Sequence, residues 1–152
     1  MGIEIERKFL VSGDAWRTAP GAEITQGYLC RSENHSVRVR LAKGRAWLAV
    51  KGRARKGVKQ EFEYPIPPED ARAMLELCPY PLIEKTRHEI AHDGFTWEVD
   101  VFKGANQGLV VAEIELEAPD QSFPRPAWIG AEVTDDPRYL NANLAVHPFS
   151  DW

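Results

Sequence analysis

The N-terminal stretch Gly2-Ile3-Glu4-Ile5-Glu6-Arg7-Lys8-Phe9-Leu10-Val11 alternates charged and apolar side chains with the two-residue period of a β-strand. One face carries Glu4, Glu6 and Lys8, and the opposite face carries Ile3, Ile5, Phe9 and Val11. A half-exposed surface strand needs only Ser, Thr or scattered charges on its outer face. The row of ionised groups therefore raises the question whether other strands supply a matching charged face.

The composition limits the classes of protein to which this chain can belong. It has 152 residues, 43% of them hydrophobic, which suffices for the core of one domain over residues 1–152. A net charge of -4 argues against a general nucleic-acid binder. Cys30 and Cys78 lack the spacing of a metal site or disulfide framework, and no signal peptide or long apolar run is evident. We therefore predict a cytoplasmic monomer or homodimer with no membrane partner.

Seven further segments have strand-like composition, most of them with the same alternation, and several place charges of one sign on one face. They are Glu23–Arg31, Ser36–Leu41, Ala46–Lys51, Lys59–Ile66, Ile83–Ile90, Phe95–Phe102 and Leu109–Glu117. Their spacing is typical of an antiparallel meander, and eight strands can close a small barrel.

The sequence predicts one clear helix over Glu69–Leu77. Proline and acidic residues precede or occupy its first turn, an apolar stripe follows, and Pro79 ends it. Shorter helices are expected within Ser12–Arg17 and within Asp135–Leu144.

The charge pattern bears on which face of the sheet is inside. One alternating strand taken alone is most often a solvated surface, and the charged rows could all face water. Solubility, however, is served by mixed charges, and helices with apolar stripes need an apolar surface on which to pack. We therefore expect an α+β fold with an eight-stranded antiparallel β-barrel, a charged interior and helices outside.

The two kinds of charged residue suit a metal-bound polyphosphate. The carboxylates are hard oxygen ligands of the kind that Mg²⁺ or Mn²⁺ prefers, and the basic side chains suit phosphate oxygens. Metals and cations around a polyanion are the components of phosphoryl transfer. Gly52 and Gly57 have the glycine spacing of a nucleotide-binding P-loop, but Val58 and Lys59 follow where Lys and Ser or Thr are required.

The stretch Glu4-Ile5-Glu6-Arg7-Lys8 resembles the N-terminal E-x-E-x-K signature of the CYTH superfamily, the triphosphate tunnel metalloenzymes. Further segments resemble family motifs in the same order along the chain. They are Val37–Arg40, Val50-Lys51, Glu61–Glu63, Lys85–Arg87, Val99–Phe102, Gly108-Leu109, Ala112–Glu115, Glu132–Thr134 and Arg138-Tyr139 with Asn141.

This resemblance implies a tunnel that binds a triphosphate with a divalent cation, Mg²⁺ or Mn²⁺, at two sites, and a C-terminal helix near one tunnel end. It implies that Glu4, Glu6 and Glu115 hold one metal, while Glu61, Glu63, Asp100 and Glu113 hold or orient a second. The implied phosphate-binding residues are Lys8, Arg38, Arg40, Lys51, Lys85, Arg87 and Arg138, and Lys85 also counts as catalytic.

Tyr28 and Lys51 are the candidates for activating the attacking water. A lysine–tyrosine pair is a proposed base in family members, and an ammonium group beside a phenol stabilises the phenolate. Tyr28 could equally be a residue of the barrel wall with a hydrogen-bonded hydroxyl, and Arg138 an arginine on the helix surface.

The predicted function is metal-dependent hydrolysis of inorganic triphosphate to pyrophosphate and phosphate, as in the inorganic triphosphatases of this family. Hydrolysis of thiamine triphosphate or a nucleoside triphosphate, and cyclisation of ATP as in class IV adenylyl cyclases, stay open as alternatives. A different class of function is a non-catalytic module that binds polyphosphate or RNA through the basic loop Gly52–Lys59.

Overall fold

The computed structural model describes residues 2–152. The strands are β1 (Gly2–Val11), β2 (Gly21–Arg31), β3 (His35–Ala42), β4 (Arg45–Gly52), β5 (Val58–Ile66), β6 (Ile83–His92), β7 (Phe95–Phe102), β8 (Val110–Glu115) and β9 (Ile129–Glu132). The α-helices are α1 (Pro68–Leu77) and α2 (Asn141–Leu144), and the 3₁₀ turns are η1 (Ala15–Thr18), η2 (Gly104–Asn106), η3 (Pro137–Tyr139) and η4 (Phe149–Asp151). None of the helices within residues 2–152 is long and apolar enough to cross a membrane.

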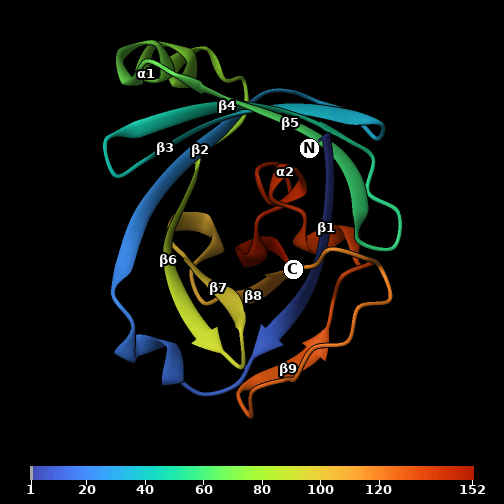
Figure 1. Ribbon diagram of the computed structural model, residues 1–152. Helices are drawn as coiled ribbons and strands as arrows, with labels where there is room; N and C mark the ends of the chain where they lie inside the picture. Colours follow the sequence, from blue (N-terminus) through green and yellow to red (C-terminus); the bar gives the residue numbers. More distant parts are fainter. Residues whose placement is uncertain (1) are drawn as a thin grey trace.

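Strands β1 to β8 close into an antiparallel barrel, which Figure 1 views along its interior. Around the ring the order is β1, β5, β4, β3, β2, β6, β7 and β8, and β8 pairs with β1 again. The first half of β1 pairs with β5, while its second half pairs with β9 along the same edge. The predicted barrel is therefore confirmed, with β9 as an additional short strand that the sequence did not reveal.

The meander runs in two halves and is not continuous as the spacing suggested. Strands β2 to β5 are sequential neighbours, and so are β6 to β8. Helix α1 connects β5 to β6, which joins the other edge of the first half beside β2. The two-residue turn Lys43-Gly44 has positive φ at both positions, as a tight hairpin with strand twist requires.

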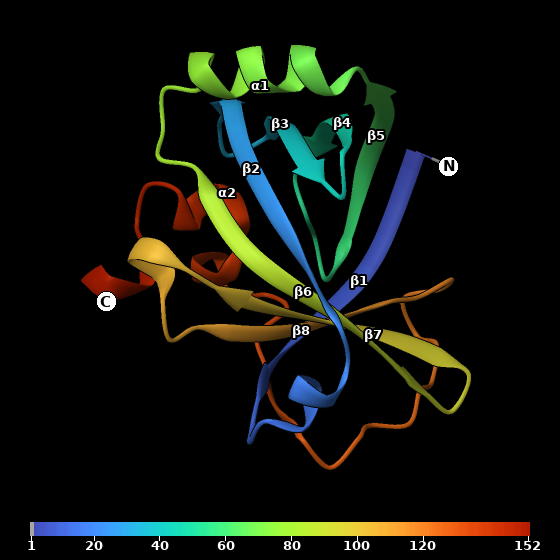
Figure 2. The same cartoon turned by 90° about the vertical axis from the view of Figure 1, so that its left-hand side faces the viewer.

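Helix α1 lies across the outer faces of β2, β3 and β4 (Figure 2). Pro68 occupies the first turn with two acidic residues beside it, and buried Ala71 faces the sheet. Ala71 packs with Val39 and Ala46 from the outer sides of β3 and β4. The predicted helix and its outside position are thus confirmed, because the apolar faces of these strands point away from the barrel interior.

The other outer face is also covered by apolar side chains. Phe9, Trp97 and Ile114 form a buried cluster on β1, β7 and β8, joined by Trp16 of η1. Phe123 and Trp128, from the segment that precedes β9, pack edge-on against Trp97. The segment that precedes β9 therefore covers part of the outer faces of β1, β7 and β8.

The C-terminal segment fills one end of the barrel. At that end the inner faces of β6, β7 and β8 change from charged to apolar, with Ile83, Phe102 and Val111. Tyr139 of η3 and Leu144 of α2 pack onto these residues in one buried cluster, and Figure 1 shows α2 within the outline of the ring. The predicted C-terminal helix is thus two short pieces, η3 and α2, and it lies at a tunnel end as expected.

Candidate active site

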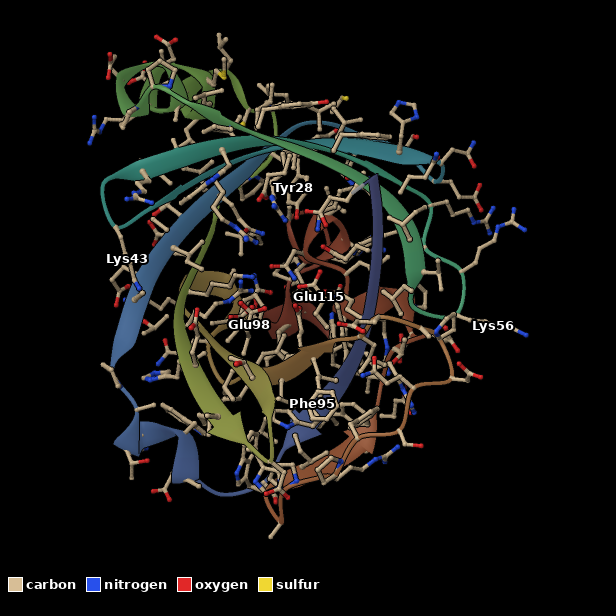
Figure 3. The ribbon with its side chains drawn as sticks, viewed as in Figure 1. Tyr28, Lys43, Lys56, Phe95, Glu98 and Glu115 are labelled. Atoms are coloured by element: carbon tan, nitrogen blue, oxygen red, sulfur yellow. The ribbon has the colours of Figure 1, made fainter. Side chains whose placement is uncertain are left out.

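A cavity of about 1170 Å³ occupies the barrel interior. The inner faces of the strands line it with charged side chains, among which are Glu4, Glu6, Lys8, Arg38, Arg40, Lys51, Lys59, Glu61, Glu63, Lys85, Arg87, Glu98, Glu113 and Glu115. Figure 3 shows Glu98 and Glu115 inside the ring of strands, whereas Lys43 and Lys56 lie on turns at its edge. The alternation of the strands therefore directs the charges inward, as the sequence predicted.

The structure brings every residue predicted for the site to this cavity except Asp100 and Arg138. Asp100 is 1% exposed and lies against Lys85 and Arg87, which themselves line the cavity. Arg138 is a correction to the prediction, because it does not line the cavity and its side chain is 59% exposed. Its guanidinium donates to Asp136 and lies over the Trp152 ring, and these contacts hold it at the surface.

One wall of the cavity, on β1 and β8, is acidic. Glu6 lies directly opposite Glu115, and Lys8 directly opposite Glu113. Burial raises the pKa of Glu115, and the nearby carboxylates of Glu4 and Glu6 raise it further. These acidic side chains therefore share one electrostatic environment, which favours the binding of a cation.

Lys59 of β5 reaches into this acidic wall. Its Nζ lies 3.1 Å from Glu4 Oε1 and 3.2 Å from Glu6 Oε1. Burial works to raise the pKa of Glu6, but the ammonium groups of Lys59 and Lys8 outweigh it and hold that pKa below its usual value. Burial likewise works to raise the pKa of Glu4, but Lys51 and Lys59 hold it below its usual value, so both glutamates are ionised at neutral pH.

Lys51 and Arg38 form the adjoining wall on β4 and β3. Lys51 Nζ lies 3.7 Å from both Glu4 Oε1 and Glu61 Oε1, and Arg38 donates to Glu63 over 2.9 Å. Burial lowers the pKa of Lys51 well below its usual value, and the neighbouring charges of Arg38 and Lys59 lower it further.

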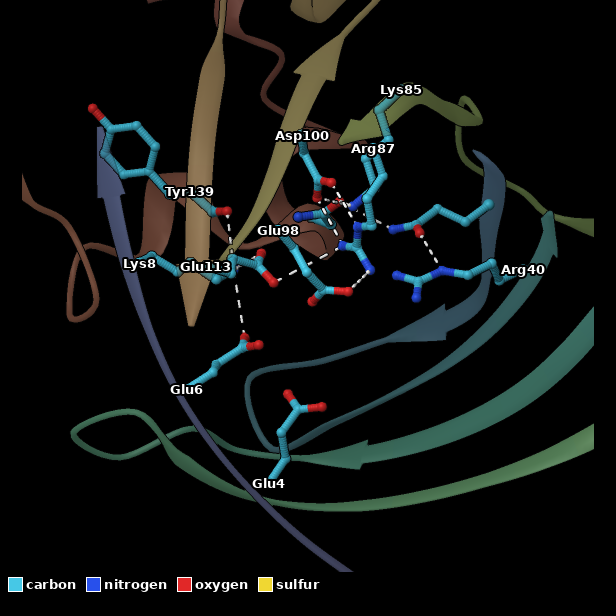
Figure 4. Close-up of polar contacts among 12 residues, drawn as sticks. Glu4, Glu6, Lys8, Arg40, Lys85, Arg87, Glu98, Asp100, Glu113 and Tyr139 are labelled. Carbon is cyan, nitrogen blue, oxygen red and sulfur yellow. Dashed lines mark hydrogen bonds and ion pairs between the residues drawn. The ribbon is translucent and has the colours of Figure 1, made fainter. Parts of the chain in front are cut away.

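Asp100 anchors the cationic side of the cavity (Figure 4). Its two oxygens accept from Nε and Nη2 of Arg87 over 2.7 and 2.9 Å, and Lys85 Nζ lies 2.8 Å from Oδ2. Although burial opposes it, these two cations hold the pKa of Asp100 well below its usual value. Burial lowers the pKa of Lys85 to about 8, and Asp100 offsets only part of that shift because Arg87 and Arg40 lie nearby. Positive charge is therefore in excess here, which suits phosphate oxygens.

Glu98 lines the cavity, although it was not among the predicted site residues. It precedes Asp100 by two positions on β7, so the two share the inner face, and it accepts from Arg87 Nη1 over 3.1 Å. Burial raises the pKa of Glu98 to about 7 despite the charge of Arg87. The alternation itself could have identified it.

Gln26 and Asn141 complete the cationic side and were also missed. Gln26 is fully buried; its amide oxygen accepts from Arg40 Nε over 2.9 Å. Asn141 Oδ1 accepts from Lys85 Nζ over 2.8 Å and from Gln26 Nε2 over 3.0 Å. The C-terminal segment thereby contacts Lys85, which is predicted to bind phosphate. The side-chain amides of Gln26 and Asn141 are neutral, so the alternation of charged residues does not reveal them. Only Asn141 was indicated, by its place in a segment that resembles a family motif.

Tyr28 lines the cavity, but the structure gives it a wall position. Its side chain is buried with Ile83 and Phe102, and its hydroxyl accepts from Gln26 Nε2 over 3.3 Å. Tyr28 lies opposite Arg38 on β3, whereas Lys51 lies on β4 one strand farther on. Within residues 2–152 no hydrogen bond joins Tyr28 to Lys51.

The acidic wall fits a metal ion by its chemistry, although among residues 2–152 no three acidic, His or Cys side chains converge on a ready-made site. Glu4 Oε1 is buried, and its neighbours within residues 2–152 are the ammonium groups of Lys59 and Lys51, so this oxygen already faces positive charge. Carboxylate oxygens are the ligands that Mg²⁺ and Mn²⁺ prefer. Glu4, Glu6 and Glu115 are the residues that would hold such an ion.

Comparison with known proteins identifies the family to which this chain belongs. The sequence model of the CYTH domain matches residues 2–145. The chain belongs to the CYTH family. Triphosphate tunnel metalloenzymes of this family depend on a metal ion.

Two curated relatives extend along nearly the whole chain. The inorganic triphosphatase of Acetivibrio thermocellus is 49% identical over 154 residues, covering 100% of this CYTH chain and 99% of the relative. The inorganic triphosphatase of Nitrosomonas europaea is 33% identical over 147 residues, covering 94% and 97%. The crystal structure of the inorganic triphosphatase NE1496 superposes with a TM-score of 0.68 at 33% identity, covering 94% of each chain.

Proposed function

We propose that this CYTH protein hydrolyses inorganic triphosphate to pyrophosphate and phosphate with the help of Mg²⁺ or Mn²⁺. The observation that carries the proposal is the cavity inside the barrel, which combines an acidic wall on β1 and β8 with an excess of cations around Asp100. That two relatives aligned over nearly their full length bear the name inorganic triphosphatase supports the choice of substrate.

The basic side chains would bind and orient the triphosphate. Positioning and charge neutralisation do most of the catalysis in phosphoryl transfer, so a fixed set of cations is what the reaction needs. The proposed set is Lys8, Arg38, Arg40, Lys51, Lys85 and Arg87. Asp100, Gln26 and Asn141 would hold Arg87, Arg40 and Lys85 in place.

The acidic residues would hold the metal. Glu4, Glu6 and Glu115 form the first proposed site, and Glu61, Glu63 and Glu113 would serve a second. A bound divalent metal neutralises phosphate oxygens and makes a coordinated water more acidic. The pairing of Asp100 with Arg87 and Lys85 favours a positioning role for this residue over the role of metal ligand that the sequence implied.

The Tyr28–Lys51 base stays a prediction, which Tyr28→Phe tests with little change in packing. If the hydroxyl takes part in proton transfer, we expect kcat to fall by about a hundredfold. Activity within about threefold of wild type would instead assign Tyr28 to the barrel wall, held there by Gln26.

A panel of substrates tests the proposed function. Phosphate release is measured from tripolyphosphate, ATP and thiamine triphosphate at equal concentration with Mg²⁺, and the expected order puts tripolyphosphate first. A higher kcat/KM for ATP or thiamine triphosphate would overturn the choice of substrate. No turnover of any triphosphate would overturn the enzymatic proposal.

Nothing in the described residues favours the alternative of an RNA-binding module. Lys59, one end of the loop assigned to that role, is buried in the cavity and paired with Glu4 and Glu6. A cytoplasmic location and a monomeric or dimeric state stay predictions from the sequence.

A further inference from the structure

Lys59 occupies a place that the proposed function leaves unexplained. It lies directly opposite Glu4 where β5 and β1 close the barrel, and its side chain is 8% exposed. Its ammonium lies within 3.2 Å of a carboxylate oxygen of both Glu4 and Glu6. The cation is thus fixed by strand register beside the two residues proposed to hold the metal.

The other ammonium groups are farther from these carboxylates. Lys51 Nζ lies 3.7 Å from Glu4 Oε1, and Lys8 Nζ lies 4.0 Å from Glu6 Oε1. Each of these two lysines has a second ion pair with another carboxylate, Lys51 with Glu61 and Lys8 with Glu113, whereas both ion pairs of Lys59 are with Glu4 and Glu6. Of these three lysines, Lys59 is thus the one that lies closest to both proposed metal ligands and pairs with no other carboxylate within residues 2–152.

We propose that Lys59 is a built-in counter-ion that weakens divalent-metal binding to Glu4 and Glu6 as long as no polyanion occupies the tunnel. A fixed positive charge a few ångströms from the ligands repels a divalent cation and cancels part of the attraction of the carboxylates. The affinity of an oxygen-ligand site falls as the net charge of its ligands becomes less negative.

A triphosphate reverses this balance. Its negative charges add to those of the glutamates and compensate Lys59, so metal and triphosphate bind more tightly together than separately. Linkage makes that coupling reciprocal. Lys59 would thus couple loading of the metal to arrival of the substrate, as a positioning residue that acts through Glu4 and Glu6. The inference rests on the metal site of the proposed function.

The test measures Mn²⁺ binding without substrate, from the electron paramagnetic resonance signal of free Mn²⁺. Lys59→Gln is compared with wild type, with Lys56→Gln as the matched control, because Lys56 lies exposed on the loop before β5. We expect Lys59→Gln to bind Mn²⁺ at least about tenfold more tightly and Lys56→Gln to bind it as wild type does. An unchanged or weaker affinity in folded Lys59→Gln overturns the proposal, even if KM for tripolyphosphate rises, because that result makes Lys59 a phosphate ligand.

Two further variants keep the test decisive. If Lys59→Gln does not fold, recovery of its circular dichroism on addition of Mn²⁺ supports the proposal, and no recovery overturns it. Lys59→Arg keeps the charge and should bind Mn²⁺ no more tightly than wild type; tighter binding contradicts the counter-ion role.

Glu6→Gln separates the two proposals. If it abolishes Mn²⁺ binding while Lys59→Gln changes nothing, the metal site stands and the counter-ion role fails. If Glu6→Gln binds Mn²⁺ as wild type does, the metal assignment fails and the counter-ion inference falls with it.

Discussion

Asp100 shows at the scale of one residue how the charged interior is held in place. Its carboxylate is buried and accepts from Arg87 and Lys85, two side chains that line the cavity. Removing one partner of a buried ion pair leaves the others uncompensated, which costs much more than losing an exposed pair.

Asp100→Asn should therefore destabilise the protein by about 3 kcal/mol, as measured by urea denaturation. Asp14→Asn is the matched control, because Asp14 and its partner Arg17 are both exposed and their ion pair spans 3.7 Å. Equal stability losses in the two variants would contradict the role of Asp100 as an anchor of buried cations.

Lys85 predicts a pH dependence of substrate binding. Because its pKa is lowered from 10.5 to about 8, the ammonium loses its proton above about pH 8 and binds phosphate less well. We expect KM for tripolyphosphate to rise above that pH. In Lys85→Arg the rise should disappear, since a guanidinium stays protonated.

The folding stability should rise with pH over the range in which substrate binding weakens. The folded pKa of Lys85 is below the unfolded one, so its contribution to stability grows as the pH rises from about 8 toward 10.5 and is lost as the pH falls through about 8. A rise of KM that coincides with alkaline unfolding, or that persists in Lys85→Arg, would refute the assignment to Lys85.

At this scale the sequence predicted most of the charged lining, because a two-residue period decides which side chains share a face. Glu98 follows the same rule but was not chosen as a site residue. Gln26 and Asn141 carry no charge, and their contacts join β2 to the C-terminal segment, so alternation could not reveal them. For Arg138 the alternative of a surface arginine applies, because Asp136 and Trp152 hold its side chain outside the cavity and the motif alone does not reveal these contacts.

At the scale of elements, the loop between β4 and β5 is fixed against β1 through Gly57. This residue has φ +80°, and a Cβ there would lie 2.4 Å from the carbonyl oxygen of Glu6. Glu6 N in turn donates to Gly57 O over 3.0 Å. The backbone of the loop thereby sets the position of Glu6 in the acidic wall.

Gly57→Ala should for this reason cost more than Gly44→Ala, although both replace a glycine of positive φ. Gly44 has φ +71° and open space around it, so its substitution should cost only the strain of about 1–2 kcal/mol. Gly57→Ala should lose more stability and also activity, because Glu6 must shift. The free energies of unfolding and phosphate-release rates of both variants check this; equal effects would show that the contact with Glu6 is unimportant.

Helix α1 was predicted almost to its ends because its proline, first-turn acids and apolar stripe are local signals. Strand β9 escaped prediction because it has four residues and pairs with β1, more than a hundred positions away. The position of η3 and α2 at one end of the barrel also depends on contacts between residues far apart in the sequence, since Tyr139 and Leu144 pack on Ile83 and Phe102.

At the scale of the whole molecule, barrel closure brings the charged rows of separate strands together around one cavity. The acidic wall comes from β1 and β8, and the excess of cations from β3 and β6. The net charge of -4 thus conceals a dense set of opposite charges that are paired inside the barrel. The sequence indicated the number of strands and the inner face. The order of the two halves of the barrel, β2 to β5 and β6 to β8, depends on the path of α1 over the sheet from β5 to the edge beside β2. No local sequence pattern specifies that path.

The central claim is that the acidic wall supports a metal-dependent hydrolysis of inorganic triphosphate. The most direct test is the initial rate of orthophosphate release from tripolyphosphate by wild type and Glu6→Gln, each with Mg²⁺ or with EDTA. We predict turnover by wild type with Mg²⁺, none with EDTA, and a rate at least about a hundredfold lower in folded Glu6→Gln. Equal rates with Mg²⁺ and EDTA, or wild-type turnover by Glu6→Gln, would contradict the claim.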